Sequence, residues 1–157
     1  MLKRIVSGGQ TGVDRGALDA ALALGFPCGG WCPRGRRAED GRIPDVYPLT
    51  ENESSRYIRR TRRNVDESDG TLIVTRGMPT GGTAATAAHA TRAGRPCFVA
   101  DLDRAPGTAA APEIRAWIAA NGIEVLNVAG PRASAFPGIA DAARDLVAAL
   151  LTPPPPS

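Results

Sequence analysis

The chain has 157 residues, of which 43% are hydrophobic and 22% charged, and its formal net charge is +3. This length and composition are typical of one soluble globular domain with a substantial core. No apolar run approaches the length of about 18 residues that a membrane span needs, and the first strand begins near residue 3, which leaves no room for a signal peptide. We therefore expect a cytoplasmic protein without membrane association.

The first element is a short strand over residues 2–6, and a glycine-rich turn, 7–15, follows it. The turn reads Ser-Gly-Gly-Gln-Thr-Gly-Val-Asp-Arg and opens an amphipathic helix with Ala17, Leu18, Ala21 and Leu22 on one face. A strand, a glycine turn and a helix place backbone N–H groups where they can bind an anion. The turn lacks the spacing of a dinucleotide fingerprint or a Walker loop. It favours phosphate or nucleotide binding, and a plain tight turn with a capped helix is the alternative.

The second strand is expected over residues 27–32, and a charged loop over residues 33–42 leaves its end. The loop holds four arginines and two carboxylates. A solvated surface loop is the simplest interpretation. However, ligands bind at the carboxyl ends of strands in open α/β sheets, and the arginine fork suits phosphate oxygens. The three cysteines, Cys28, Cys32 and Cys97, are too few for a disulfide framework and are expected to be buried thiols, with Cys32 as the alternative sulfur ligand.

A helix with four arginines among five residues is expected after Thr50-x-x-Glu53, which has the pattern of a capping box. Tyr57, Ile58, Thr61 and Val65 would face the sheet, and one arginine would point into the site while the others remain solvated. Because like charges on one helix repel one another, nearby anions or acidic residues are needed to offset this cluster.

Strand 71–75 is followed by a second glycine-rich loop, 77–83, and by an alanine-rich helix to about residue 93, with Thr83 as the expected N-cap. Both glycine loops would emerge on the same edge of a parallel sheet. His89 lies in the middle of this helix and is expected to have a packing or surface role rather than a catalytic one.

The rest of the chain continues the same alternation. A strand is expected at 97–100, a helix that starts near Pro112 and ends at 121–122, a strand at 123–128, and a last helix with the stripe Ile139, Ala143, Leu146 and Leu150. The predicted fold class is α/β, a single Rossmann-like doubly wound domain over residues 1–151. Its mainly parallel sheet would have about five or more strands, with helices on both faces. Residues 152–157 would form a disordered Pro-rich tail.

Six segments of the chain together resemble the molybdenum carrier family. They are 8–15, 32–41, 60–65, 68–73, 81–83 and 127–134, and the first two are the most specific. The resemblance covers residues 3 to about 150, and the family is similar in turn to the Rossmann-like group that contains the lysine decarboxylase-like nucleotide phosphoribohydrolases. It implies binding of a nucleotide-like ligand or of the molybdenum cofactor, a pterin that carries a phosphate. It also implies a homo-oligomer, either a dimer or a tetramer.

One departure from the related hydrolases concerns catalysis. Their Pro-Gly-Gly-x-Gly-Thr-x-x-Glu pattern ends in an essential glutamate, whereas this chain has Ala85 and Thr86 in that region. Without that carboxylate, acid or base help at a ribosyl bond has no obvious source, unless Asp14, Glu39 or Asp40 supplies it. We therefore expect a protein without catalytic residues, and the alternatives are a nucleotide-processing enzyme of the phosphoribohydrolase type and a nucleotide sensor.

The expected ligand is a phosphate-bearing small molecule, either the molybdenum cofactor or a nucleotide, bound at the C-terminal edge of the sheet. No protein-bound metal is expected, and single-stranded nucleic acid is a poor candidate partner because only 4% of the residues are aromatic. The residues expected to bind the ligand come from both glycine loops, the arginine loop and the arginine-rich helix: Gly8, Gly9, Gln10, Thr11, Gly12, Asp14, Arg34, Arg36, Arg37, Arg60, Asn64, Thr80, Gly81, Gly82 and Thr83.

Overall fold

The structure is a computed structural model that describes residues 1–153. Its strands are β1 (Arg4–Val6), β2 (Cys28–Gly29), β3 (Trp31–Cys32), β4 (Arg37–Ala38), β5 (Gly41–Arg42), β6 (Thr50–Glu51), β7 (Gly70–Thr75), β8 (Cys97–Asp101) and β9 (Val125–Ala129). Its helices are α1 (Val13–Ala23), α2 (Tyr57–Asp66), α3 (Gly81–Arg92), α4 (Ala111–Ala120) and α5 (Ile139–Leu151). Residues 154–157 of the expected tail lie outside the described residues.

The main sheet has five parallel strands in the order β2-β1-β9-β7-β8. The last strand in the sequence, β9, lies between β1 and β7, with Ile5 beside Leu126 and Leu72 beside Val128. Helices follow the strands as the alternating pattern requires. The predicted Rossmann-like α/β fold is confirmed.

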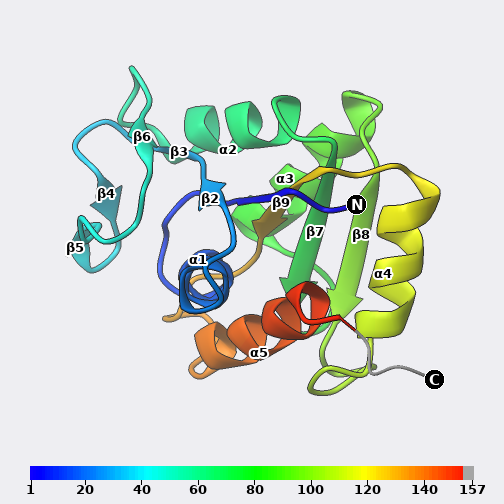
Figure 1. The fold of residues 1–157 in the computed structure, drawn as a ribbon. Coiled ribbons are helices and arrows are strands. Elements are labelled where there is room, and N and C mark those ends of the chain that lie inside the picture. The colour runs from blue at the N-terminus through cyan, green and yellow to red at the C-terminus, as the bar shows by residue number, and fades with distance from the viewer. Residues whose placement is uncertain (154–157) are drawn as a thin grey trace.

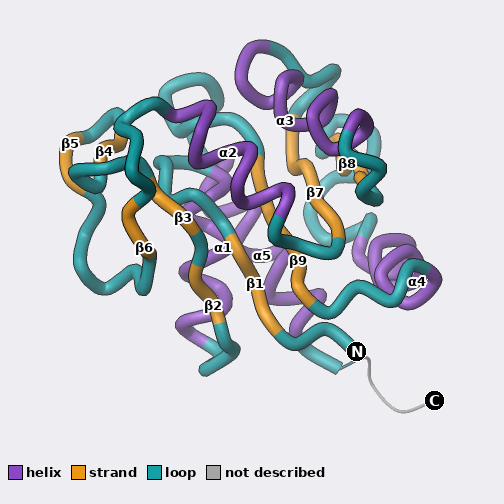
Figure 2. Tube along the Cα trace, turned by 90° about the horizontal axis from the view of Figure 1, so that it is seen from above, coloured by secondary structure: helices purple, strands orange, loops and turns teal. Residues whose placement is uncertain are grey.

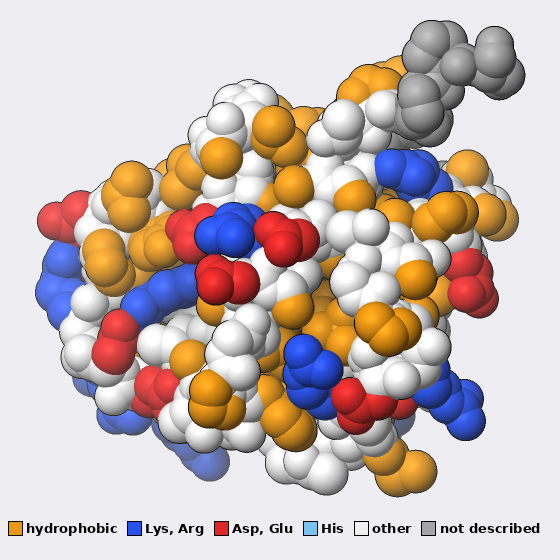
Figure 3. Space-filling model, turned by 90° about the horizontal axis from the view of Figure 1, so that it is seen from below, with side chains coloured by type: hydrophobic (Ala, Val, Ile, Leu, Met, Phe, Trp, Pro, Cys, Tyr) orange, Lys and Arg blue, Asp and Glu red, His pale blue; other side chains and the backbone are white. Residues whose placement is uncertain are grey.

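Helices cover both faces of the sheet, with α2 and α3 on one face and α1 and α5 on the other (Figure 1). The larger hydrophobic core lies on the α1–α5 face, where Leu72, Val74 and Leu126 are fully buried. Helices α1 and α5 pack so closely that a Cβ atom on Gly16 would lie 2.2 Å from the Ala140 carbonyl oxygen. Seen from this side, the molecule mixes apolar side chains with interspersed acidic and basic ones (Figure 3).

A small accessory layer lies beyond β1 and β2, away from the main sheet (Figure 2). It contains the antiparallel pair β4–β5 and the parallel pair β3–β6. Cys32, Ala38 and Ile43 form its buried core, and Tyr47 and Leu49 pack against them. The arginine loop is therefore folded onto apolar residues rather than fully solvated.

Four local predictions were wrong. The strand expected at 27–32 is split into β2 and β3, because Gly30 has φ +131° and lies so close to Ser7 that a Cβ atom would be 2.2 Å from its carbonyl oxygen. Thr50 is not part of a capping box, since it lies in β6 and α2 begins only at Tyr57. Thr80, not Thr83, is the N-cap of α3, and Leu22 is 37% exposed rather than buried on the core face.

Candidate functional site

A cavity of about 450 Å³ opens at the C-terminal edge of the main sheet, between α2 and α3. Its walls come from the loops that follow β1, β7 and β9 and from the inner sides of α2 and α3, so it lies at the edge where open α/β sheets bind ligands. The volume is within the usual range for small-molecule sites.

The cavity brings together nine of the residues predicted from the sequence and leaves six outside. Those that line it are Gly8, Gln10, Asp14, Arg60, Asn64, Thr80, Gly81, Gly82 and Thr83. Those that do not are Gly9, Thr11, Gly12, Arg34, Arg36 and Arg37. Both glycine loops therefore reach the same cavity, whereas no residue of the arginine loop lines it.

The N-terminus of α3 faces the cavity with unused backbone donors. Thr80 is the N-cap, makes no side-chain capping hydrogen bond, and accepts the first intrahelical bond from Ala84 at 3.2 Å. Within residues 1–153, the N–H groups of Gly81, Gly82 and Thr83 have no acceptor, and the first turn carries no acidic side chain. Such a helix start attracts anions through its N–H groups and the helix dipole.

The first glycine loop, in contrast, has already used much of its hydrogen-bonding capacity. The Gln10 N–H donates to Asp14 Oδ2 at 3.2 Å, and the Thr11 N–H donates to Gln10 Oε1 at 3.0 Å. Gly12 has φ +83° and lies against the loop after β9, where a Cβ atom would be 2.4 Å from the Pro131 carbonyl oxygen. These contacts shape the cavity wall and leave few free donors in this loop.

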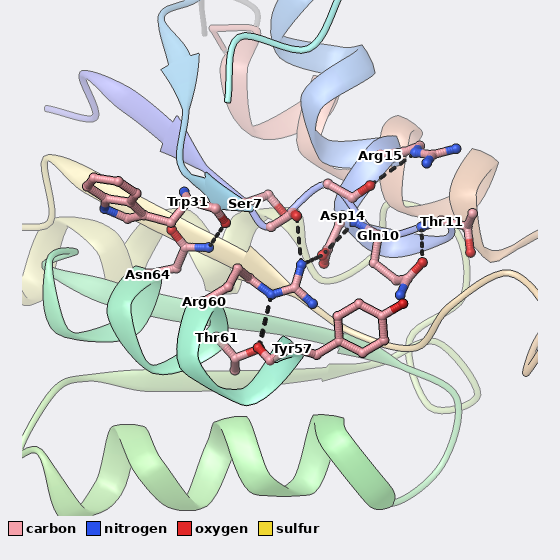
Figure 4. A network of polar contacts seen from close by, with 12 residues as sticks. Ser7, Gln10, Thr11, Asp14, Arg15, Trp31, Tyr57, Arg60, Thr61 and Asn64 are labelled. Atoms are coloured by element: carbon pink, nitrogen blue, oxygen red, sulfur yellow. Dashed lines mark hydrogen bonds and ion pairs between the residues drawn. The ribbon is translucent and has the colours of Figure 1, made fainter. Parts of the chain in front are cut away.

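Arg60 is the arginine of α2 that turns into the cavity, and it is only 6% exposed. Its Nη1 donates to the Gly8 carbonyl at 2.6 Å and lies 3.9 Å from Asp14 Oδ2 (Figure 4). Burial raises the pKa of Asp14, and the positive charge of Arg60 partly offsets this effect. The two side chains form a buried pair at the inner end of the cavity.

Gln10 has a fixed side-chain orientation because Oε1 accepts two backbone N–H groups, from Thr11 at 3.0 Å and from Glu39 at 2.9 Å. Its Nε2 is therefore turned the other way, toward the Tyr57 hydroxyl (Figure 4). This nitrogen is buried and has no hydrogen-bond partner among the described residues. An unpaired buried donor costs free energy, which makes it notable in a cavity wall.

Tyr57 forms part of the cavity wall under an unusual concentration of positive charge. Guanidinium carbons of Arg37, Arg60 and Arg132 lie 5.1, 5.5 and 5.7 Å from the centre of its ring. The hydrogen bond from Arg37 foremost, then the nearby Gln10 amide and the positive charges of Arg37 and Arg132, lower the pKa of the Tyr57 hydroxyl. Arg37 thus acts at the cavity through Tyr57, although it does not line the cavity itself.

Two predicted binding residues are fully engaged by the protein. The guanidinium of Arg36 donates to four carbonyl oxygens of the accessory layer, at 3.0 Å (Ile43), 3.3 Å (Leu49), 2.7 Å (Pro44) and 3.0 Å (Tyr47). The Asn64 side chain reaches the cavity, but it exchanges two hydrogen bonds with the backbone of Trp31, at 2.8 and 3.0 Å. Arg36 holds its own loop together, and Asn64 fixes β3 to α2.

The two acidic residues of the arginine loop fasten it to neighbouring loops. Glu39 accepts hydrogen bonds from the Thr11 hydroxyl and from the Ser134 hydroxyl and N–H, the latter two at 2.6 and 3.1 Å. These bonds, that from the Ser134 hydroxyl foremost, lower the pKa of Glu39. Asp40 pairs with Arg15 through two hydrogen bonds. Neither carboxylate lines the cavity.

Sequence reasoning missed several residues of the cavity. Tyr57 was assigned only a packing role, and Arg132 was included only in segment 127–134 of the family resemblance. Thr75 and Asn127, which are 1% and 2% exposed, line the cavity from β7 and β9. Their signal was present in the sequence, because polar residues are unusual in the apolar strands of a parallel sheet.

The described residues 1–153 contain no group of three or more His, Cys, Asp or Glu side chains that could hold a metal ion. In the same range, no helix is long and apolar enough to cross a membrane. All three cysteines are free, and burial raises the pKa of the Cys32 thiol.

Comparison with known proteins gives two matches. The model of a family described as the circularly permutated YpsA SLOG family matches residues 5–151. A crystal structure of a putative molybdenum carrier protein from Syntrophus aciditrophicus SB is 47% identical in sequence, with a TM-score of 0.94 over 96% of each chain. No curated protein matches the chain.

Proposed function

The chain belongs to the circularly permutated YpsA SLOG family, and on this premise we propose that it binds a phosphate-bearing small molecule in the cavity between α2 and α3. The observation that carries the proposal is the N-terminus of α3, whose unpaired N–H groups face this cavity. The phosphate would accept hydrogen bonds from Gly81, Gly82 and Thr83. Each such bond to a charged group contributes about 1.5–3 kcal/mol.

Positive charge on the opposite wall supports the same placement. Arg60 lies at the inner end of the cavity, and Arg132 lies at its rim with 45% of its side chain exposed. The Thr80 and Thr83 side chains flank the helix start and can add hydroxyl donors. The phosphate would thus lie between a helix N-terminus and the Arg132 guanidinium, both of which favour anions, while Asp14 offsets much of the charge of Arg60.

The role that this arrangement supports best is that of a carrier of the molybdenum cofactor, with the pterin phosphate as the group that is held. The 47% identical structure of a putative molybdenum carrier protein supports this role. The polar groups of the cavity also fit such a cargo. The cavity offers hydrogen-bond donors for a phosphate and polar wall groups, but no cluster of metal-binding side chains among residues 1–153. The metal would then remain bound to its pterin.

A nucleotide-processing enzyme is the second candidate, and Asp14 is the observation that favours it. Asp14 is the one Asp or Glu that lines the cavity within the described residues, and its raised pKa suits a general acid. Thr86, in the region of the missing hydrolase glutamate, uses its hydroxyl to donate to the Gly82 carbonyl at 2.9 Å. An assay for release of base or ribose phosphate from nucleotides, with Asp14→Ala as control, separates an enzyme from a carrier or a sensor.

The phosphate site can be tested by placing a negative charge on it. A Cβ atom at Gly82 would meet nothing within 4 Å, so Gly82→Asp fits without strain and brings a carboxylate to the helix start. We expect Gly82→Asp to weaken binding of GMP by about 30-fold or more, whereas the neutral control Gly82→Asn changes it only a few-fold. Equal affinities of wild type and Gly82→Asp, measured by titration calorimetry, would refute the site.

The carrier role is tested by what the protein holds when it is purified gently from its own host. Native mass spectrometry followed by denaturation identifies the released molecule. A pterin or a molybdenum species supports the carrier, and a nucleotide shifts the conclusion to a sensor or an enzyme.

A further inference from the structure

The inner end of the cavity presents an acceptor and a donor side by side. Asp14 and Arg60 are 7% and 6% exposed, come from different elements, and both line the cavity. Asp14 Oδ2 lies 3.9 Å from Arg60 Nη1, so each side chain offsets much of the charge of the other (Figure 4). This corner is therefore poorly suited to a second phosphate, because an anion bound to Arg60 would lie beside a carboxylate.

Both members of this pair still have atoms that are available for hydrogen bonds to a ligand. Arg60 uses Nη1 for the Gly8 carbonyl and Nε for Tyr57 and Thr61, while Nη2 has no acceptor among residues 1–153. Asp14 Oδ2 accepts the Gln10 N–H, and no hydrogen bond within residues 1–153 ends at Oδ1.

The Asp14 carboxylate can still accept several hydrogen bonds. The nearby Ser7 hydroxyl donates to the Val128 carbonyl at 2.6 Å instead of to Asp14. A carboxylate has about four lone-pair positions, so Asp14 can accept at least two more hydrogen bonds. The pair thus offers a strong donor next to an acceptor with room for two N–H groups.

We propose that Asp14 and Arg60 recognise the 2-amino-4-oxo edge of a planar heterocycle, the edge that pterins share with guanine. The carbonyl oxygen would accept from Arg60 Nη2, and the adjacent ring N–H and amino group would donate to Asp14. Hydrogen bonding of this kind selects strongly, because a ligand that lacks the groups leaves the buried partners unpaired. The assignment rests on the proposed function, since the phosphate at α3 anchors the ligand in the cavity.

The wild-type protein tests the proposal directly with GMP, IMP and AMP, which carry the same ribose phosphate. IMP lacks the amino group, and AMP has an amino group in place of the carbonyl. We expect GMP to bind at least tenfold more tightly than AMP, with IMP between them. Affinities for GMP and AMP within twofold of each other would overturn the proposal while the phosphate site stands. Failure of all three nucleotides and of neopterin monophosphate to bind would overturn the proposed function as well.

The variant Asp14→Asn gives a sharper test because the structure fixes how the new amide would lie. The Gln10 N–H requires an oxygen at the position of Oδ2, so the asparagine would turn its NH₂ group into the cavity. We expect GMP affinity to fall tenfold or more and AMP affinity to stay within about threefold. If Asp14 had a purely structural role, Asp14→Asn would weaken the binding of GMP and of AMP by the same factor. That result would overturn the proposal.

Asp40→Asn is the matched control, because it removes a carboxylate from an ion pair with Arg15 outside the cavity. It is expected to leave the ratio of GMP to AMP affinity unchanged. Should Asp14→Asn fail to fold, as judged by circular dichroism, the wild-type nucleotide series decides alone. A parallel titration with neopterin monophosphate shows whether the recognised edge belongs to a pterin or to guanine. Neopterin monophosphate binds more tightly than GMP if the cargo is a pterin, and GMP binds more tightly if the cargo is a nucleotide.

Discussion

Replacement of Arg36 by alanine should destabilise the protein without removing a contact to the ligand. Its guanidinium is nearly buried, lies outside the cavity, and satisfies four carbonyl oxygens of the loop that follows it. Hydrogen bonds to a charged group contribute about 1.5–3 kcal/mol each, but water can reach some of these carbonyls once the side chain is gone. We therefore expect a loss of about 3 kcal/mol in the free energy of unfolding.

Urea denaturation followed by circular dichroism measures this loss, and at this chain length it corresponds to roughly 6–12 °C in melting temperature. Arg34→Ala is the control, because Arg34 is exposed and its side chain makes no hydrogen bond within the described residues; it should change stability by less than about 0.5 kcal/mol. A variant Arg36→Ala that is as stable as wild type but binds GMP tenfold more weakly would refute the reasoning and restore Arg36 as a ligand residue.

Two further changes test the contacts that shape the cavity wall. Gly12→Ala should cost about 3 kcal/mol or more, because its Cβ would overlap the Pro131 carbonyl at φ +83°, whereas Gly25→Ala, with φ +62° and open space around it, should cost about 1 kcal/mol in chemical denaturation. The folded-state pKa of Glu39 lies below its unfolded value, so its contribution is fully present above about pH 5 and is lost as the pH falls through the folded pKa. The melting temperature of Glu39→Gln should accordingly fall less than that of wild type between about pH 5 and 3. Parallel curves of melting temperature against pH for the two proteins would contradict the role of the Ser134 contact.

The fold was predictable because its signals are local. Alternating apolar strands and amphipathic helices define the α/β class, and glycine loops after β1 and β7 point to one edge of the sheet. The position of Arg60 also followed from a simple argument, since a helix with four arginines near its centre has to turn one of them toward the site or toward an acidic partner.

The remaining features depend on contacts between distant segments, which residue type does not encode. Arg36 has the same side chain as Arg60, but its loop closes on itself and offers carbonyl oxygens, so it binds the backbone instead of facing the cavity. Gly30 broke the expected strand because Ser7 passes close to it. Asn127 could have been recognised as a buried polar residue of a strand, but not as a residue that shares the cavity with Asp14, because nothing local places β9 beside β1.

The central position of β9 has a consequence for the synthesis of the chain. Strands β1 and β7 do not pair with each other, so the sheet consists of two separate parts, β2–β1 and β7–β8, until residues 125–129 have left the ribosome. The loop after β9 also completes the cavity wall. A nascent chain can therefore form its early helices and the antiparallel pair β4–β5, but the cavity is complete only in the last stage of translation.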